Sequence, residues 1–228
     1  IVVKFEKKDT PQKVNIKLFR QGPKDIRLND TKISQKELIG TLNTVIFCPE
    51  DLQLIKGTPS GRRRFLDMEI SQTSATYYHQ LMQYNRLLQQ RNAILKEYRG
   101  NQNIPLEEWD LQLADMASFI VKKRLESLKK INLLIDLMNR KLTGGLENLT
   151  IGYEQPYMDN GSLEYTKEGF YERIKAALPQ DRHRLTTSVG PHRDDLRFFS
   201  DAMDLKKFGS QGQQRTAVLS LKLSELEF

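Results

Sequence analysis

The chain has 228 residues and a hydrophobic fraction of 38%, which suffices to bury a core in one large or two small domains and excludes global disorder. No run of about eighteen consecutive apolar residues occurs, which excludes a membrane-spanning helix. The 36 Lys and Arg residues outnumber the 29 Asp and Glu residues, and the resulting net charge of +7 fits a polyanionic partner without requiring one.

The cysteine content indicates the cellular compartment of the protein, and the two ends of the sequence indicate whether it is part of a longer chain. Cys48 is the only cysteine, so no intramolecular disulfide can form, as expected of a cytoplasmic protein. The three histidines are too scattered to indicate a metal site. The chain starts at Ile1 without a signal-peptide pattern and stops at Phe228 within a helical pattern, so we expect it to be part of a longer protein.

Residues 1 to about 48 have the pattern of strands. Apolar and polar residues alternate over residues 1–5 and 14–18, and turn residues follow at Gln21–Lys24 and Asn29–Asp30. A short β-branched run, Thr44–Phe47, ends at Pro49. We predict an antiparallel sheet followed by one buried strand.

Two long helices are predicted next, because residues 62–99 and 106–143 contain neither Gly nor Pro. Gly100 and Gly144 are suited to end them, and Pro105 is suited to the first position of the second helix. Apolar residues spaced by three and four indicate that the two helices pack as an antiparallel pair. The Ser and Thr cluster in residues 71–76 offers a place where the first helix could break.

Residues 147–228 return to mixed structure. Strands are predicted at Leu149–Ile151 and Leu196–Phe199, a short helix after Thr166, and a last helix over Thr216–Phe228. The fold class is therefore α/β (α+β), an α/β body with antiparallel strands that carries an inserted, mainly helical lobe. We expect the body to comprise residues 1–60 and 185–228, and the helical lobe to comprise residues 61–184.

The strongest candidate site is the segment Phe208–Thr216, in which two glycines flank Ser210 immediately before a helix. Gly209 and Gly212 permit a close backbone approach, and Ser210 is a good N-cap. The free N–H groups and the positive dipole end of such a helix can bind an anion. The alternative is an ordinary capped helix after a tight turn.

Two groups of basic residues are candidate contacts for DNA or a protein partner. Arg62, Arg63 and Arg64 lie at a helix N-terminus, where they oppose the helix dipole and so invite a functional explanation. Lys122, Lys123 and Lys130 belong to a basic stripe on the second long helix and could follow a phosphate backbone. The alternatives are a self-paired basic turn and a solvated helix face.

A third candidate is the charged turn Gly190–Leu196, in which His192, Arg193, Asp194 and Asp195 follow a Gly-Pro pair. Adjacent carboxylates could bind a metal, but neighbours on a strand point to opposite faces. We therefore predict no metal site here. A P-loop of the form Gly-x-x-x-x-Gly-Lys-[Ser/Thr] is missing from the sequence, and so is a hydrophobic strand that ends in paired acids.

The motifs together resemble the RecF family of bacterial recombination mediators, which are ATPases related to chromosome-maintenance and Rad50-like proteins. The resemblance covers nearly the whole chain. The resembling segments, in family order, are residues 47–52, 56–67, 190–196 and 210–216.

The resemblance implies that Ser210, Gln211, Gly212, Gln213 and Gln214 form an ABC signature, which contacts ATP held by a second subunit. It also implies Mg²⁺, an ATP-dependent homodimer, binding to double-stranded and gapped DNA, and cooperation with RecR and possibly RecO. The P-loop and the metal-binding acids are expected outside these residues, so this chain alone is expected not to hydrolyse ATP. Position 211 is Gln where transporters usually carry Gly, which disfavours a transporter subunit. The other alternative is a helical module that only docks proteins.

Overall fold

The computed structural model describes residues 1–7, 9–39, 41–42, 44–97, 105–157 and 165–227. These residues form two compact units, Ile1–Thr44 and Val45–Phe228. The fold is a mixture of helices and antiparallel sheets, as predicted. The division into a body and an inserted lobe at residues 60 and 184 stays a prediction.

The first unit is an antiparallel sheet in the order β1-β2-β3-β4. β1 and β2 are antiparallel neighbours, and Val3 of β1 lies opposite Val14 of β2. Val14 and Ile26 are the residues that this sheet buries. Asn29 and Asp30 both have positive φ, as the predicted two-residue turn requires. The elements are β1 (Val2–Lys7), β2 (Thr10–Lys17), β3 (Asp25–Leu28), β4 (Thr31–Lys32) and α1 (Gln35–Leu38).

The buried strand predicted for Thr44–Phe47 is wrong. Residues 44–48 have no regular secondary structure, and the Ile46 and Phe47 side chains are 68% and 59% exposed. A β-branched run becomes a strand only where a neighbouring strand takes its hydrogen bonds. The chain then continues through the 3₁₀ helix η1 (Pro49–Leu52) and α2 (Gln53–Lys56).

The first long helical stretch is two helices, α3 (Pro59–Thr73) and α4 (Ala75–Glu97). They meet at Ser74, inside the segment where a break was predicted. Ser74 is extended at φ −139°, its N–H donates to Ile70 O, and its Oγ accepts from the Tyr77 N–H. One serine thus ends α3 and begins α4. Gly100, the predicted end of this stretch, lies outside the described residues.

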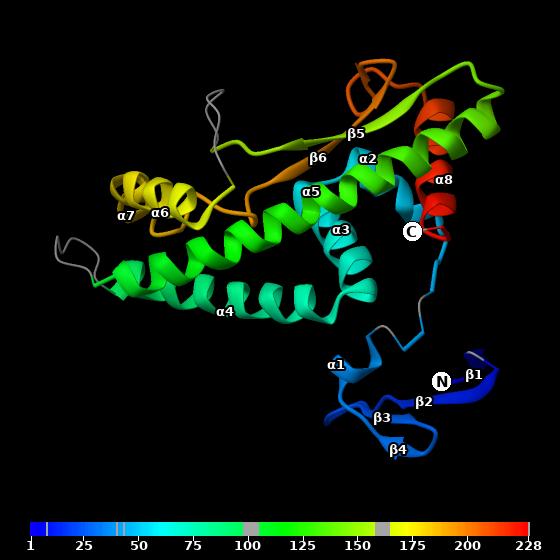
Figure 1. Ribbon diagram of the computed structural model, residues 1–228, viewed down its shortest axis with the longest axis horizontal. Coiled ribbons are helices and arrows are strands. Elements are labelled where there is room, and N and C mark those ends of the chain that lie inside the picture. The colour runs from blue at the N-terminus through cyan, green and yellow to red at the C-terminus, as the bar shows by residue number, and fades with distance from the viewer. Residues whose placement is uncertain (8, 40, 43, 98–104, 158–164, 228) are drawn as a thin grey trace. The chain divides into compact units, whose positions relative to one another are not determined.

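The second stretch is one continuous helix, α5 (Glu107–Thr143), about 55 Å long. Gly144 ends it with a left-handed φ of 68°, as predicted. The prediction for Pro105 is wrong by two positions, because Leu106 is the N-cap and Glu107 the first helical residue. In Figure 1, α4 runs alongside α5, and β5 and β6 follow α5 as well.

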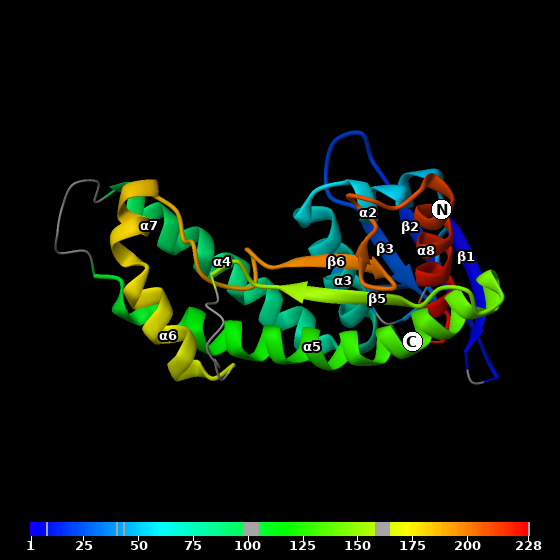
Figure 2. The same cartoon turned by 90° about the horizontal axis from the view of Figure 1, so that it is seen from above.

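A second antiparallel sheet, β5-β6-β7, lies along α5 (Figure 2). Leu149 pairs with Ser200 at one end of the β5–β6 ladder and Glu154 with Asp195 at the other. The helices α6 and α8 pack against α5 near its opposite ends. These elements are β5 (Leu149–Glu154), α6 (Lys167–Ala176), α7 (Leu178–Arg184), β6 (Asp195–Ser200), β7 (Met203–Asp204) and α8 (Gln211–Ser224).

Candidate functional site

The predicted anion site at the start of α8 is a capped helix on a tight turn. Ser210 is the N-cap, and its Oγ accepts from the Gln213 N–H at 3.2 Å. In return, Gln213 Oε1 accepts from the Ser210 N–H at 2.9 Å, which completes a capping box. Gly209 is required by space, since a Cβ there would lie 2.6 Å from Leu205 O.

The five residues predicted to form the signature, 210–214, divide into an exposed group and an internal group. Ser210, Gln211 and Gly212 are exposed, whereas Gln213 is half-buried and Gln214 is buried. Gln214 Nε2 donates to Leu205 O at 2.7 Å, so this side chain holds the turn before the helix. Ser210 and Gln211 can therefore present their side chains to a ligand, whereas Gly212 can present only its backbone.

The backbone of the same segment leaves two donors facing outward. The Gln213 and Gln214 amides already donate to Ser210, through its Oγ and its carbonyl oxygen. Within the described residues, no hydrogen bond engages the amides of Gln211 and Gly212. Two exposed N–H groups at the positive end of a helix dipole are suited to an anion such as a phosphate.

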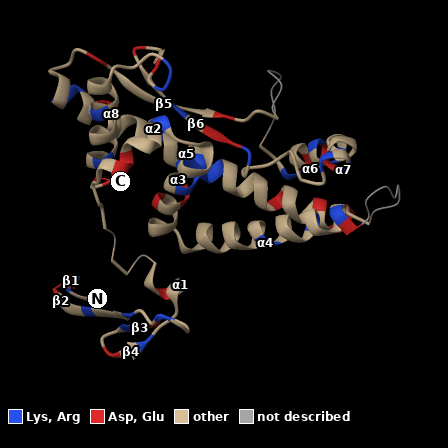
Figure 3. Cartoon of the chain, turned by 180° about the vertical axis from the view of Figure 1, so that it is seen from behind, with Lys and Arg blue, Asp and Glu red and all other residues tan. Residues whose placement is uncertain are grey.

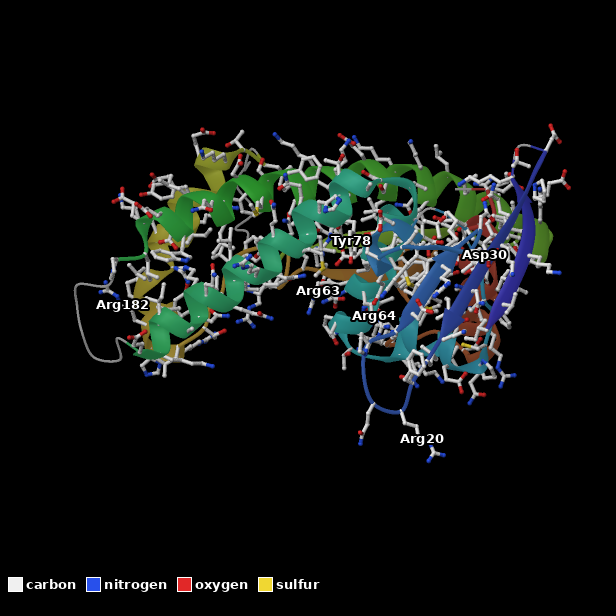
Figure 4. The ribbon with its side chains drawn as sticks, turned by 90° about the horizontal axis from the view of Figure 1, so that it is seen from below. Arg20, Asp30, Arg63, Arg64, Tyr78 and Arg182 are labelled. Atoms are coloured by element: carbon white, nitrogen blue, oxygen red, sulfur yellow. The ribbon has the colours of Figure 1, made fainter. Side chains whose placement is uncertain are left out.

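The three consecutive arginines of α3 have different environments. Arg62 is 3% exposed, forms a bidentate pair with Asp195 at 2.7 and 2.8 Å, and donates to Gly57 O. Arg63 is half-buried and donates to Asp194 O at 2.7 Å. Arg64 is exposed on α3 (Figure 4). The structure thus removes Arg62 from the candidate contacts for DNA, because its guanidinium is buried and paired.

The basic residues of α5, coloured blue in Figure 3, differ in their exposure. Lys122 and Lys130 are exposed, and Lys123 is half-buried and pairs with Glu126 at 2.7 Å. Arg124, which lies between them in the sequence, is only 2% exposed. The exposed lysines can reach a phosphate backbone, whereas Arg124 belongs to the interior.

Arg124 is the centre of a buried network that the sequence analysis did not identify. Its guanidinium donates to both carboxylate oxygens of Asp67 at 2.9 Å, to Pro191 O at 2.7 Å, and to Asp194 at 3.4 Å. Asp194 also accepts from the hydroxyls of Tyr153 and Tyr157. Burial raises the pKa of Asp194, while Arg124 and the hydroxyls act in the opposite direction.

A second buried arginine, Arg91 of α4, pairs with carboxylates of two other helices. It donates to Asp110 at 2.6 Å, to Asp181 at 2.7 Å and to the Thr187 hydroxyl at 2.9 Å. Burial raises the pKa of Asp110, and the charge of Arg91 opposes that shift. This cluster joins α4, α5 and α7 to the segment that precedes β6.

The charged turn at Gly190–Leu196 is a structural junction. His192 Nε2 lies 3.0 Å from Thr187 O, and because a carbonyl oxygen only accepts, Nε2 carries the proton. Nδ1 of the neutral ring then accepts from the Tyr84 hydroxyl at 2.6 Å. Burial lowers the pKa of His192 to about 4, which keeps the ring neutral.

The described residues contain no group of three or more His, Cys, Asp or Glu side chains that could hold a metal ion. Asp194 lies just before β6 and Asp195 is its first residue, and their carboxylates have different partners. No helix of the described part of the chain is both long and apolar enough to cross a bilayer.

Comparison with known proteins gives one consistent result. No protein-family model matches the chain. The DNA replication and repair protein RecF of Clostridium botulinum (strain Eklund 17B / Type B) is 45% identical over 222 residues, which is 97% of this chain and 60% of the relative. RecF of Alkaliphilus oremlandii (strain OhILAs) is 44% identical over 230 residues, which is 100% of this chain and 63% of the relative.

A solved structure of the recombination mediator protein RecF-ATPrS in the RecFOR pathway matches 96% of this chain and 60% of its own length, at 35% identity and a TM-score of 0.87. The corresponding RecF-ATP structure matches with a TM-score of 0.86. The chain spans about three fifths of the length of the curated relatives that it matches. Over nearly all of its residues, the chain therefore matches a segment of RecF both in sequence and in fold.

Proposed function

We propose that this chain is part of a DNA repair and recombination mediator that binds ATP with Mg²⁺, dimerises on the nucleotide and binds double-stranded DNA near gaps. The similarity to RecF over nearly the whole chain is the observation that carries the proposal. In such a protein RecR and possibly RecO are the partners that load recombinase, and the compartment is the cytoplasm. The activity is that of a weak ABC-type ATPase.

The start of α8 supplies the chemical basis for nucleotide binding between subunits. The exposed Ser210 hydroxyl and the outward-facing amides of Gln211 and Gly212 are hydrogen-bond donors without a charge of their own. Such donors stabilise phosphate oxygens where water is excluded. A bound nucleotide would supply the negative phosphate charge that this helix end can bind, and its Mg²⁺ would offset part of that charge. The residues that hold the nucleotide of the same subunit are expected elsewhere.

The test is Ser210→Arg in a full-length RecF protein that contains this chain. The larger side chain fills the space in front of the two amides, so we expect loss of dimerisation driven by a slowly hydrolysed ATP analogue. Nucleotide binding to the monomer is expected to stay within about twofold, since it uses other residues. Light scattering measures the dimer, and a fluorescent-nucleotide titration measures binding.

Thr76→Arg, at an exposed position of α4, is the matched control and should dimerise normally. Loss of dimerisation and of nucleotide binding together would indicate misfolding of the Ser210 variant. Normal dimerisation of Ser210→Arg would reduce this segment to an ordinary capped helix and would overturn the proposed site.

Binding to DNA is expected to be sensitive to salt and tolerant of sequence. The supporting observation is the set of exposed lysines on α5 together with a net charge of +7. We propose Arg63, Arg64, Lys122, Lys123 and Lys130 as the residues that contact phosphates or a partner.

Charge reversal of Lys122 and Lys130 tests this surface. It should weaken duplex binding and lower the slope of log affinity against log salt by about one for each lost contact. Reversal of two exposed lysines of the first unit, Lys4 and Lys17, is the control for net charge. An equal loss in both variants would show that total charge, and not the α5 surface, determines binding.

A further inference from the structure

Glu147 lies in the turn between α5 and β5 and connects three elements. Its Oε1 accepts from Gln213 Nε2 of α8 at 3.0 Å, and its Oε2 accepts from the Ser200 hydroxyl of β6 at 3.0 Å. Its carbonyl oxygen accepts from Asn139 Nδ2 of α5 at 2.9 Å. Asn139 Oδ1 in turn accepts from the Ser220 hydroxyl of α8 at 3.2 Å. The end of α5 is thus tied to α8 at two points.

The contact with Glu147 determines how the Gln213 amide is oriented. The Ser210 N–H, 2.9 Å from Gln213 Oε1, can only donate, and the ionised Glu147 carboxylate, 3.0 Å from Nε2, can only accept. A rotated amide would place donor against donor and acceptor against acceptor. Glu147 therefore selects the amide orientation that closes the capping box around Ser210.

We propose that Glu147 is a positioning residue for the nucleotide site at the start of α8. By holding the Gln213 amide, it keeps Ser210 in its capping conformation and keeps the Gln211 and Gly212 amides directed outward. Because the Glu147 carbonyl oxygen accepts from Asn139 of α5, the same residue also ties this helix start to the long helix. This inference rests on the nucleotide-binding function proposed above for the same segment.

Exchanging the amide of Gln213 with the carboxylate of Glu147 tests their contact. Gln213→Glu alone places two carboxylates about 3 Å apart, where like charges repel. Adding Glu147→Gln restores a donor–acceptor pair, because the amide introduced at position 147 can donate to the carboxylate introduced at position 213. The other oxygen of that carboxylate can then accept from the Ser210 N–H, as in the usual Ser-x-x-Glu capping box.

Dimerisation on a slowly hydrolysed ATP analogue is measured in the full-length protein. We expect Gln213→Glu and Glu147→Ala to weaken it about tenfold, the effect of losing one charge-assisted hydrogen bond. The double variant Glu147→Gln with Gln213→Glu should return to within about twofold of the unmodified protein. Asn132→Ala removes contacts with the Ile151 backbone and serves as a control for stability alone, so it should dimerise normally.

Hydrogen exchange of the Ser210 amide in the 228-residue chain is the second readout. We expect faster exchange in Gln213→Glu and recovery in the double variant. Normal Ser210 exchange and normal dimerisation in Gln213→Glu, beside a failing Ser210→Arg, would overturn the role of Glu147 and leave the nucleotide site standing. Normal dimerisation in Ser210→Arg would overturn both. A double variant that folds but stays as defective as Gln213→Glu would also overturn the role of Glu147.

Discussion

Asp194 and Asp195 are adjacent in the chain, yet their carboxylates bind arginines of different helices. Asp195 pairs with Arg62 of α3 at 2.7 and 2.8 Å, and Asp194 lies 3.4 Å from Arg124 of α5. The strand β6, which begins at Asp195, is therefore fixed to two helices at its start.

Arg62→Ala should destabilise the chain far more than Arg64→Ala. Removing Arg62 leaves the Asp195 carboxylate without its bidentate partner, and breaking such a buried pair costs about 3 kcal/mol. Arg64 is exposed, and its removal should change stability by at most about 0.5 kcal/mol. Urea unfolding followed by the fluorescence of Trp109, the single tryptophan, measures both. Equal effects would contradict a structural role for Arg62.

Gly190→Ala should also destabilise the chain, by about 2–3 kcal/mol. Gly190 has φ of 130°, which side-chain-bearing residues rarely adopt, and a Cβ there would collide with the Tyr84 hydroxyl. Gly61→Ala is the matched control, because that position lies in α3 with open space around it and Ala favours a helix. The stabilities of the two variants are compared by their melting temperatures. A Gly190→Ala variant as stable as Gly61→Ala would show that the junction can relax.

His192 makes stability depend on pH on the acid side. Burial lowers its pKa in the folded chain to about 4, below the ordinary value of 6.5, so the unfolded chain takes up the proton first. Stability is fully present above about pH 6.5 and is lost as the pH falls toward 4, by up to about 3 kcal/mol. His192→Gln keeps a donor and an acceptor but cannot titrate. Unfolding free energies of both proteins between about pH 4 and 7 should diverge toward acid, and parallel curves would refute the assignment.

Glu69 makes the stability of the folded chain depend on pH in the opposite direction. Burial, and then the charge of Glu225, raise its pKa to about 7, so the folded chain prefers the neutral acid. Stability from this group is present below its ordinary pKa of 4.5 and is lost as the pH rises through 7. Glu69→Gln should therefore be more stable than the unmodified chain at about pH 8, by about 2 kcal/mol, and not at about pH 4. Thermal melts at the two pH values test this, and an equal difference at both would argue for a packing effect instead.

Much of the helical architecture could be predicted from the sequence, because it follows from local signals. The absence of Gly and Pro identified the long helices, and Gly144 ends α5 where a left-handed residue is needed. The strand expected at Thr44–Phe47 failed because pairing depends on a partner strand that local sequence does not specify. The helix α7 was missed because Pro179, expected to follow a helix, occupies the first turn of a new one.

The site at α8 was located from its glycines and serine, but the inward direction of Gln214 depends on the distant Leu205 carbonyl. The sequence did contain a pattern that indicated buried positions for Arg91 and Arg124, but their charge made these two residues look like surface residues. Arg124 falls in the series 121, 124, 128, 131 and 135, and Arg91 in the series 77, 81, 84, 88, 91 and 95, both spaced by three and four. An arginine within an apolar series is thus a candidate for an interior ion pair.

Arg91 also determines how α4 and α5 can pair. If either helix slid by one turn along the other, about 5.4 Å, apolar residues would still meet apolar residues. Arg91 would then leave Asp110, and a guanidinium with no exposed surface would lose a carboxylate that lies 2.6 Å away. The buried Asp110 carboxylate would then lack its cationic partner, and breaking such a buried pair costs about 3 kcal/mol. The leucines and tyrosines make the pair of helices adhere, and the arginine selects one alignment among several of similar apolar contact.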